Sequence, residues 1–204
     1  MIDLYGYERQ LTYDGYKAIC GTDEAGAGPL AGPVYAAAVI LRPGFEIKGI
    51  NDSKKLSERK REELFDVITA NAVSYCVASV SEKIIDEINI LNARMYAMRN
   101  AVAGLSVKPD YLLVDGNFDP EAGVETMTLV KGDSRSASIA AASILAKVSR
   151  DRFMVEMDRL YPQYGFAKHK GYGTKLHIEA LKKYGPCPIH RTTFIKNFIG
   201  GSVE

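Results

Sequence analysis

The chain of 204 residues has no tryptophan, only three cysteines and no apolar run approaching the roughly 18 residues that a membrane helix needs. Its N-terminus also lacks the basic start and apolar stretch of a secretory signal. We therefore expect a cytoplasmic protein with no membrane partner. The cysteines, Cys20, Cys76 and Cys187, form no C-x-x-C pair, and their odd number does not suit a disulfide framework, so we expect buried free thiols.

The chain also lacks a marked net charge, which is +1 at neutral pH, but the charges are unevenly distributed. Residues 1–130 carry 13 Lys and Arg against 19 Asp and Glu, whereas residues 131–204 carry 13 against 6. The basic second part suggests a polyanionic partner. Solvated helix faces would explain the charge pattern alone equally well.

Apolar patterning predicts strands that alternate with helices. The expected strands cover residues 17–22, 34–41, 72–80, 111–115 and 125–130. The expected helices cover residues 57–70, 81–105 with a break near Asn89, 134–161 and 174–184. This order predicts an α/β protein with a mixed sheet flanked by helices. We expect one domain over residues 1–204, in which residues from about 160 to 204 form a basic, helical, loosely attached substrate-binding extension.

Acidic residues occur where three of the predicted strands end. Asp23 and Glu24 follow the first strand, Asp115 ends the fourth, and Asp133 lies between the fifth strand and a helix. Ligands collect at the ends of strands in α/β sheets. If the first and fourth strands are adjacent and parallel, Asp23 and Asp115 lie side by side, and the start of the helix can bring Asp133 over them.

Carboxylates crowded in this way repel one another unless cations lie between them. Oxygen ligands alone favour Mg²⁺ or Mn²⁺ over zinc, and two such ions can hold a phosphodiester for hydrolysis. Taken singly, Asp133 could cap a helix and Asp115 could close a turn. Together, the acidic sites favour metal chemistry.

The glycine-rich segment "GAGPLAG", Gly26 to Gly32, would let a ligand approach the main chain closely. It is not the G-x-G-x-x-G fingerprint, and no helical pattern follows it, which argues against a dinucleotide-binding fold. No G-x-S-x-G motif is present, which argues against a serine hydrolase of the α/β type.

Five blocks, in order between Ile19 and Phe194, closely resemble type 2 ribonuclease H, the bacterial ribonuclease HII family. They read "GTDEAGAGPLAGPV", "NDSKKLS", "LLVDG", "KGDSRSASIAAASILAKVSRD" and "YGFAKHKGYGTKLH". The resemblance implies a ribonuclease H-like fold with a helical C-terminal extension. It implies a metal-dependent endonuclease that cleaves the RNA strand of RNA–DNA hybrids and cuts at single ribonucleotides in duplex DNA. The implied products carry 5′-phosphate and 3′-hydroxyl ends.

Position by position, the resemblance implies a set of functional residues. The implied catalytic and metal-binding residues are Asp23, Glu24, Asp115 and Asp133, which would hold two Mn²⁺ or Mg²⁺ ions. The implied substrate-binding residues are Gly26, Ala27, Gly28, Lys54, Lys55, Ser134, Lys170 and Tyr172.

One of these positions departs from the family pattern. The family's substrate-reading turn is Gly-Arg-Gly, and its main chain contacts the 2′-hydroxyl at the RNA-to-DNA junction. Here Ala27 stands in place of the arginine. We therefore expect recognition of the junction to persist. We also expect reduced activity, because alanine cannot bond the phosphate that an arginine would reach.

The remaining assignments are open between a functional and a structural reading. Tyr172 matches a family tyrosine that packs against a sugar, although lone aromatic residues usually belong to a core. Lys54 and Lys55 suit phosphate contacts that weaken as salt rises. His169 could serve proton transfer or a phosphate, or could be a loop histidine bonded to the backbone. We interpret His177 and His190 as structural.

Two other functions remain as alternatives. One is a nucleic-acid binding module whose acids no longer catalyse, and the other is an integrase-like or resolvase-like nuclease that cuts DNA. A duplex with one ribonucleotide, compared with an all-DNA duplex, would separate them. We expect a monomer that binds RNA–DNA hybrids or DNA containing ribonucleotides.

Overall fold

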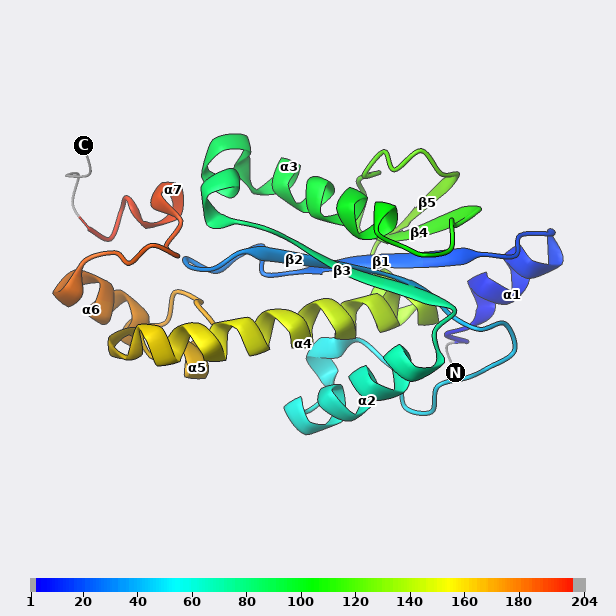
Figure 1. Cartoon of the computed structure of the whole chain (residues 1–204), viewed down its shortest axis with the longest axis horizontal. Coiled ribbons are helices and arrows are strands. Elements are labelled where there is room, and N and C mark those ends of the chain that lie inside the picture. The colour runs from blue at the N-terminus through cyan, green and yellow to red at the C-terminus, as the bar shows by residue number, and fades with distance from the viewer. Residues whose placement is uncertain (1–2, 200–204) are drawn as a thin grey trace.

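The computed structural model describes residues 3–199 and contains one mixed sheet between layers of helices (Figure 1). The strands lie in the order β3-β2-β1-β4-β5. Their bounds are Ile19–Ala25 (β1), Val34–Ile40 (β2), Ser74–Val80 (β3), Tyr111–Asp115 (β4) and Thr126–Leu129 (β5). β1 runs antiparallel to β2 and parallel to β4, so the sheet changes direction beside β1. The predicted mixed α/β sheet is confirmed.

Seven α-helices and three short 3₁₀ turns are present in residues 3–199. The helices are Gly6–Tyr13 (α1), Glu58–Asn71 (α2), Glu82–Ala103 (α3), Ala137–Leu160 (α4), Phe166–His169 (α5), Lys175–Tyr184 (α6) and Thr192–Ile195 (α7). The turns are Ser53–Lys55 (η1), Gly132–Ser134 (η2) and Pro162–Tyr164 (η3). α3 covers one face of the sheet, and α2 and α4 cover the other (Figure 1). None of these helices is long and apolar enough to cross a membrane.

The helices can be compared with the sequence predictions at three places. α1 has no counterpart among the predicted helices, because its sequence GYERQLTY is polar and buries only Leu11. The long helix begins at Ala137 rather than at residue 134, because Ser136 caps it and the preceding residues form η2. The break expected near Asn89 is confirmed, since this residue has φ 66° inside α3.

Small residues bring α4 close to the centre of the sheet. A Cβ atom on Gly21 would lie only 2.1 Å from the carbonyl carbon of Ser138, so only glycine fits at this position of β1. The alanines of α4 from Ala140 to Ala142 are fully buried against Ala37 and Val39 of β2. Close packing of this helix on the sheet therefore follows from its alanine-rich face.

The C-terminal segment packs firmly around the segment that follows β1. Tyr164 and Phe166 are buried in one cluster with Ala31 and Met154. His190 forms an antiparallel bridge with Ala31. The expectation of a loosely attached extension is therefore wrong for the described part of this segment, because its aromatic residues are needed to complete a core. α5, α6 and α7 lie at the end of the sheet opposite α1 (Figure 1).

Candidate active site

The parallel pairing of β1 and β4 brings two acidic residues to the same edge of the sheet. Thr22 pairs with Val114, and Asp23 and Asp115 are the next residues of their strands. Both lie inside the strands as the structure defines them. The expectation that Asp23 and Glu24 follow the first strand is wrong, because β1 continues to Ala25, three residues beyond the expected end. Their predicted adjacency is confirmed by the parallel register.

Asp23 and Glu24 project toward opposite faces of the sheet because neighbouring residues of a strand alternate. Asp23 is buried, and its pKa is raised well above the usual value by burial and then by the Glu24 and Asp115 carboxylates. The Ser143 hydroxyl of α4 opposes this effect. Asp23 is therefore a carboxyl group whose negative charge is costly without a nearby cation.

Glu24 is paired with an arginine of α3. Arg94 Nη2 lies 2.6 Å from Glu24 Oε1, and the other carboxylate oxygen is buried without a partner in residues 3–199. Burial raises the pKa of Glu24, Arg94 lowers it in part, and Asp115 raises it further. Glu24 thus has one carboxylate oxygen paired with Arg94 and a second oxygen, Oε2, that could bind a cation.

Asp115 holds the turn that carries Asp133. Its Oδ1 accepts hydrogen bonds from the backbone N–H of Gly132 at 2.6 Å and of Asp133 at 3.4 Å. Burial, together with Asp115 and Asp52, raises the pKa of Asp133 to about 6. Asp133 does not cap α4, since the Ile139 N–H bonds the Ser136 hydroxyl at 3.2 Å. The alternative of a helix cap is therefore wrong for Asp133.

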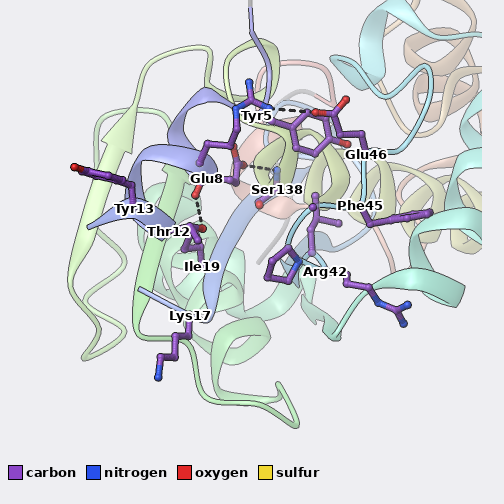
Figure 2. A pocket seen from close by; sticks show the side chains of 14 residues that line it. Tyr5, Glu8, Thr12, Tyr13, Lys17, Ile19, Arg42, Phe45, Glu46 and Ser138 are labelled. Atoms are coloured by element: carbon purple, nitrogen blue, oxygen red, sulfur yellow. Dashed lines mark hydrogen bonds and ion pairs between the residues drawn. The ribbon is translucent and has the colours of Figure 1, made fainter. Parts of the chain in front are cut away.

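α1 holds the start of α4, the helix that directly follows the turn with Asp133. Glu8 Oε1 accepts from the Ser136 hydroxyl at 2.6 Å and from the Ser138 N–H at 2.8 Å, which anchors the start of α4. Figure 2 shows Glu8 and Ser138 at a cavity of about 440 Å³ that also borders Lys17 and Ile19. This cavity lies at the start of β1, whereas the acids lie at its end, so it is separate from the candidate site.

A second cavity, of about 320 Å³, lies beside the acid pair. Its lining residues are Asp23, Glu24, Ala25, Gly26, Ala27, Gly28, Ser53, Lys54, Ser143, Lys147, Arg150 and Tyr172. The turn Gly26–Gly28 and Tyr172 face each other across it, since a Cβ atom on Gly28 would lie 3.9 Å from Tyr172 Cε1. Tyr172 is 46% exposed, so it is not a core residue. The cavity is large enough to hold a small part of a polymer.

The two neighbouring lysines differ in position. Lys54 borders the cavity, and the Asp23, Asp133 and Asp52 carboxylates outweigh its burial and raise its pKa. Lys55 is exposed, and its ammonium group lies 3.6 Å from Asp52. Lys54 is therefore a counter-charge for the acids, while Lys55 lies outside the cavity.

Two further predicted residues do not line the cavity. The Ser134 hydroxyl donates to the backbone oxygen of Lys131 at 2.9 Å, so it closes η2. The side chain of Lys170 bonds the Ala167 carbonyl, and its own carbonyl accepts from Arg150 at 3.0 Å. The main chain of Lys170, rather than its charge, is what connects it to the site.

His169 has a structural role. It is buried, its Nε2 lies 2.8 Å from the Tyr164 carbonyl oxygen, and its Nδ1 accepts from the Gly171 N–H at 3.2 Å. Both ring nitrogens are therefore occupied, and the hypothesis of proton transfer or phosphate contact is wrong for this conformation. His177 and His190 are buried and joined through their Nε2 atoms at 3.0 Å, as expected for structural histidines.

Several cationic and polar residues near the site were missed by the sequence analysis. Ser143, Lys147 and Arg150 all border the cavity and are spaced at one helical face of α4. Polar residues at that spacing in an otherwise apolar helix could have signalled a functional face. Arg94 and Arg191 had no such local signal, because each meets its partner from a distant part of the chain.

The donor chemistry of the four acids fits a hard divalent cation, although their atoms are not gathered around one point. Within residues 3–199, no three Asp, Glu, His or Cys side chains form a ready coordination shell. Arg94 holds Glu24 on the α3 side, and Asp115 is bonded to η2. The raised pKa values of Asp23 and Asp133 and the unpartnered Glu24 oxygen indicate a site that lacks positive charge.

Comparisons with known proteins match almost the whole chain. The family model for ribonuclease HII matches residues 20–197. The chain is 59% identical over 198 residues to ribonuclease HII of Acetivibrio thermocellus, covering 97% of this chain and 77% of that relative. It is 56% identical over 197 residues to ribonuclease HII of Caldicellulosiruptor bescii, covering 97% and 96%. The crystal structure of the ribonuclease H2 from Pyrococcus horikoshii matches with a TM-score of 0.75 and 29% identity, over 90% of this chain and 97% of that one.

Proposed function

The chain belongs to the ribonuclease HII family, and from this premise we propose that the acids at the ends of β1 and β4, with Asp133, form its active site. The protein is an endoribonuclease, a hydrolase that cleaves the RNA strand of RNA–DNA hybrids. The observation that carries the proposed site is the parallel register of β1 and β4, which pairs Thr22 with Val114, the residues directly before Asp23 and Asp115.

Two divalent ions, Mn²⁺ or Mg²⁺, would be held by Asp23, Glu24, Asp115 and Asp133. When bound, such ions activate water and stabilise the charge that develops on a phosphodiester during hydrolysis. Positive charge that arrives at the site would lower the raised pKa values of Asp23 and Asp133 and so favour the ionised forms that bind a metal. Lys54, which now balances these acids, would then be free to contact a phosphate.

The proposed substrate includes duplex DNA that contains a single ribonucleotide, which would place the enzyme in ribonucleotide excision repair. Cleavage would leave 5′-phosphate and 3′-hydroxyl ends. The turn of Gly26, Ala27 and Gly28 and the ring of Tyr172 line the same cavity, which supports joint recognition of the sugar at the junction. The exposed Lys55 would contact the edge of the substrate. The site would use Ser134 and Lys170 through the backbone that they hold in place. Ala27 offers no cation to a phosphate, so affinity would be reduced.

We further propose a monomer that works in the cytoplasm and has no membrane partner. Its three cysteines, Cys20, Cys76 and Cys187, are free thiols, which suits a reducing compartment. Its substrates, RNA–DNA hybrids and DNA with embedded ribonucleotides, would be met in the compartment that contains the DNA.

A cleavage assay on two duplexes tests this function. The duplexes differ only in one ribonucleotide, and each is incubated with Mn²⁺ and either the natural protein or Asp133→Asn. We expect the natural protein to cut only the duplex with the ribonucleotide, and the variant to bind it without cutting. Cleavage of both duplexes would favour a DNA nuclease, and binding without cleavage by the natural protein would favour a binding module.

A further inference from the structure

Two buried arginines bind the main chain of the segment from Gly26 to Pro33, whose first three residues form the turn that lines the active-site cavity. Arg150 and Arg191 have exposed fractions of 1% and 0%, and neither forms an ion pair with a carboxylate in residues 3–199. Backbone carbonyl groups satisfy them instead. Arg191 donates to the oxygens of Gly26 at 2.6 Å, Ala27 at 2.9 Å and Gly32 at 2.9 and 2.8 Å. Arg150 donates to those of Ala31 at 3.1 Å, Pro33 at 3.1 Å and Lys170 at 3.0 Å.

The bonds from Arg191 determine where the N–H groups of the turn point. In a trans peptide the carbonyl of one residue and the N–H of the next point in opposite directions, and every described peptide bond here is trans. Because the carbonyls of Gly26 and Ala27 point toward Arg191, the N–H groups of Ala27 and Gly28 point away from it. Neither N–H group has an acceptor within the described chain. Gly28 is exposed and Ala27 is half-buried at the cavity.

Arg150 joins the residues that follow this turn to the loop that carries Tyr172. It bonds Ala31 and Pro33 on the first segment and Lys170 on the second, and the Leu30 N–H donates to Gly171 at 2.9 Å. A Cβ atom on Gly26 would lie 2.1 Å from Arg150 Nε, so the guanidinium occupies the space that a side chain would need. Arg150 therefore packs against the turn at Gly26 and is bonded to the tyrosine loop at Lys170, so it lies between the two.

The same arginines place positive charge beneath the outward-pointing donors. Burial and the neighbouring Arg150 lower the pKa of Arg191 to about 9, so its guanidinium remains protonated near pH 7. A positive charge behind two N–H groups strengthens their attraction for an oxygen acceptor. A ribose 2′-hydroxyl offers such an acceptor, whereas a deoxyribose does not.

We propose that Arg191 and Arg150 are positioning residues for ribonucleotide discrimination. Arg191 directs the N–H groups of Ala27 and Gly28 toward the 2′-hydroxyl, and Arg150 sets the position of Tyr172 relative to them. This inference rests on the proposed function, because it assigns the origin of sugar selectivity within that same site. A deoxynucleotide in this place would leave two desolvated donors unpaired, which costs binding free energy.

The test measures binding of two duplexes that differ in a single 2′-hydroxyl. The Asp133→Asn protein is used with Mn²⁺ so that the substrate stays intact. We expect it to bind the duplex with the ribonucleotide about tenfold or more tightly than the all-DNA duplex, the effect of about one hydrogen bond. Adding Arg191→Lys keeps the charge but removes the planar fork, and we expect it to reduce this ratio to within about threefold.

Arg152→Lys is the matched control, because Arg152 lies on the same helix as Arg150 and pairs with Glu62 at the surface. It should leave the ratio unchanged. A folded Arg191→Lys protein that keeps the full ratio would overturn the proposal. Failure of the natural protein to cut at a ribonucleotide would instead refute the proposed function.

A second measurement needs no change at either arginine. In the Asp133→Asn protein, the amide resonances of Ala27 and Gly28 should shift more on binding the ribonucleotide duplex than on binding the all-DNA duplex. Equal shifts with both duplexes would show that these N–H groups do not sense the hydroxyl. The proposal would then fail even if Arg191→Lys could not be obtained in folded form.

Discussion

Arg94 Nη2 lies 2.6 Å from Glu24 Oε1, so a helix on one face of the sheet neutralises a carboxylate at the end of the central strand. Both side chains are largely buried, with 25% and 11% exposed. A divalent cation that binds Glu24 must compete with, or share, this guanidinium. The pair is therefore both a stabilising contact in the metal-free protein and a competitor for metal binding.

Replacing Arg94 by Gln should lower the thermal midpoint of the metal-free protein and enlarge its increase on adding Mn²⁺. The variant leaves Glu24 buried without a partner, at a cost of about 2–3 kcal/mol, or about 4–12 °C for a chain of this length. Calorimetry with EDTA and with Mn²⁺ measures both effects. Arg99→Gln, on the same helix but over the ring of Tyr96, should change neither. An equal Mn²⁺ effect in the natural protein and in Arg94→Gln would show that the two cations do not compete.

Replacing Gly26 by Ala should destabilise the protein more than the same change at Gly15. Both residues have positive φ, 98° and 105°, so both substitutions carry similar backbone strain of about 1 kcal/mol. Only at Gly26 would the new Cβ meet Arg150, at 2.1 Å, whereas Gly15 has open space. We expect an additional loss of about 2 kcal/mol at Gly26 in chemical denaturation. An equal loss of unfolding free energy in the two variants would mean that Arg150 can move aside without destabilising the protein.

Replacing Ala27 by Arg should increase affinity for a nucleic-acid duplex. The new guanidinium can bond a phosphate, which contributes about 1.5 kcal/mol, roughly a tenfold lower dissociation constant. The affinity of the variant should also depend more steeply on salt, with a change of about one unit in the slope of log affinity against log salt concentration. Ala27→Gln, which is long but uncharged, is the control and should leave the slope unchanged. If Ala27→Arg changes neither affinity nor turnover, the proposed phosphate contact does not exist.

Acidification should destabilise the C-terminal segment through its buried histidines. Burial and the neighbouring His177 lower the pKa of His190 to about 4, while the unfolded chain titrates near 6.5. Between these values the unfolded state binds more protons, so stability is complete above pH 6.5 and falls as the pH drops toward 4. The full contribution is about 3 kcal/mol.

Urea denaturation of the natural protein and of His190→Gln at pH 7 and pH 5 measures this contribution. The difference in unfolding free energy between the two pH values should be smaller in the variant. Because the acids of the active site titrate equally in both proteins, they cancel in this comparison. An unchanged pH dependence in His190→Gln would contradict the assignment of acid sensitivity to this residue.

The strands and the acidic residues could be predicted because their signals are local. A buried strand such as Val34–Ile40 is a continuous apolar run, and Asp115 directly ends another such run. α1 could not be predicted in this way, because it buries only Leu11 and is held by contacts of Glu8 with the start of α4. The polar pattern of a helix that caps another element resembles that of a loop.

The amino-acid sequence alone was enough to predict the mixed α/β architecture, the candidate acids and the family resemblance. Periodicity and motifs are read over a few neighbouring residues, and these features are expressed at that range. The pairing of cationic side chains with oxygen atoms became visible only in the folded chain. Lys54 rather than Lys55 lies beside the acids, Arg94 pairs with Glu24, and Arg191 bonds the turn at Gly26. A buried charged side chain must be paired with whichever polar group folding removes from water beside it, and for Arg191 that group lies 165 residues away in the sequence.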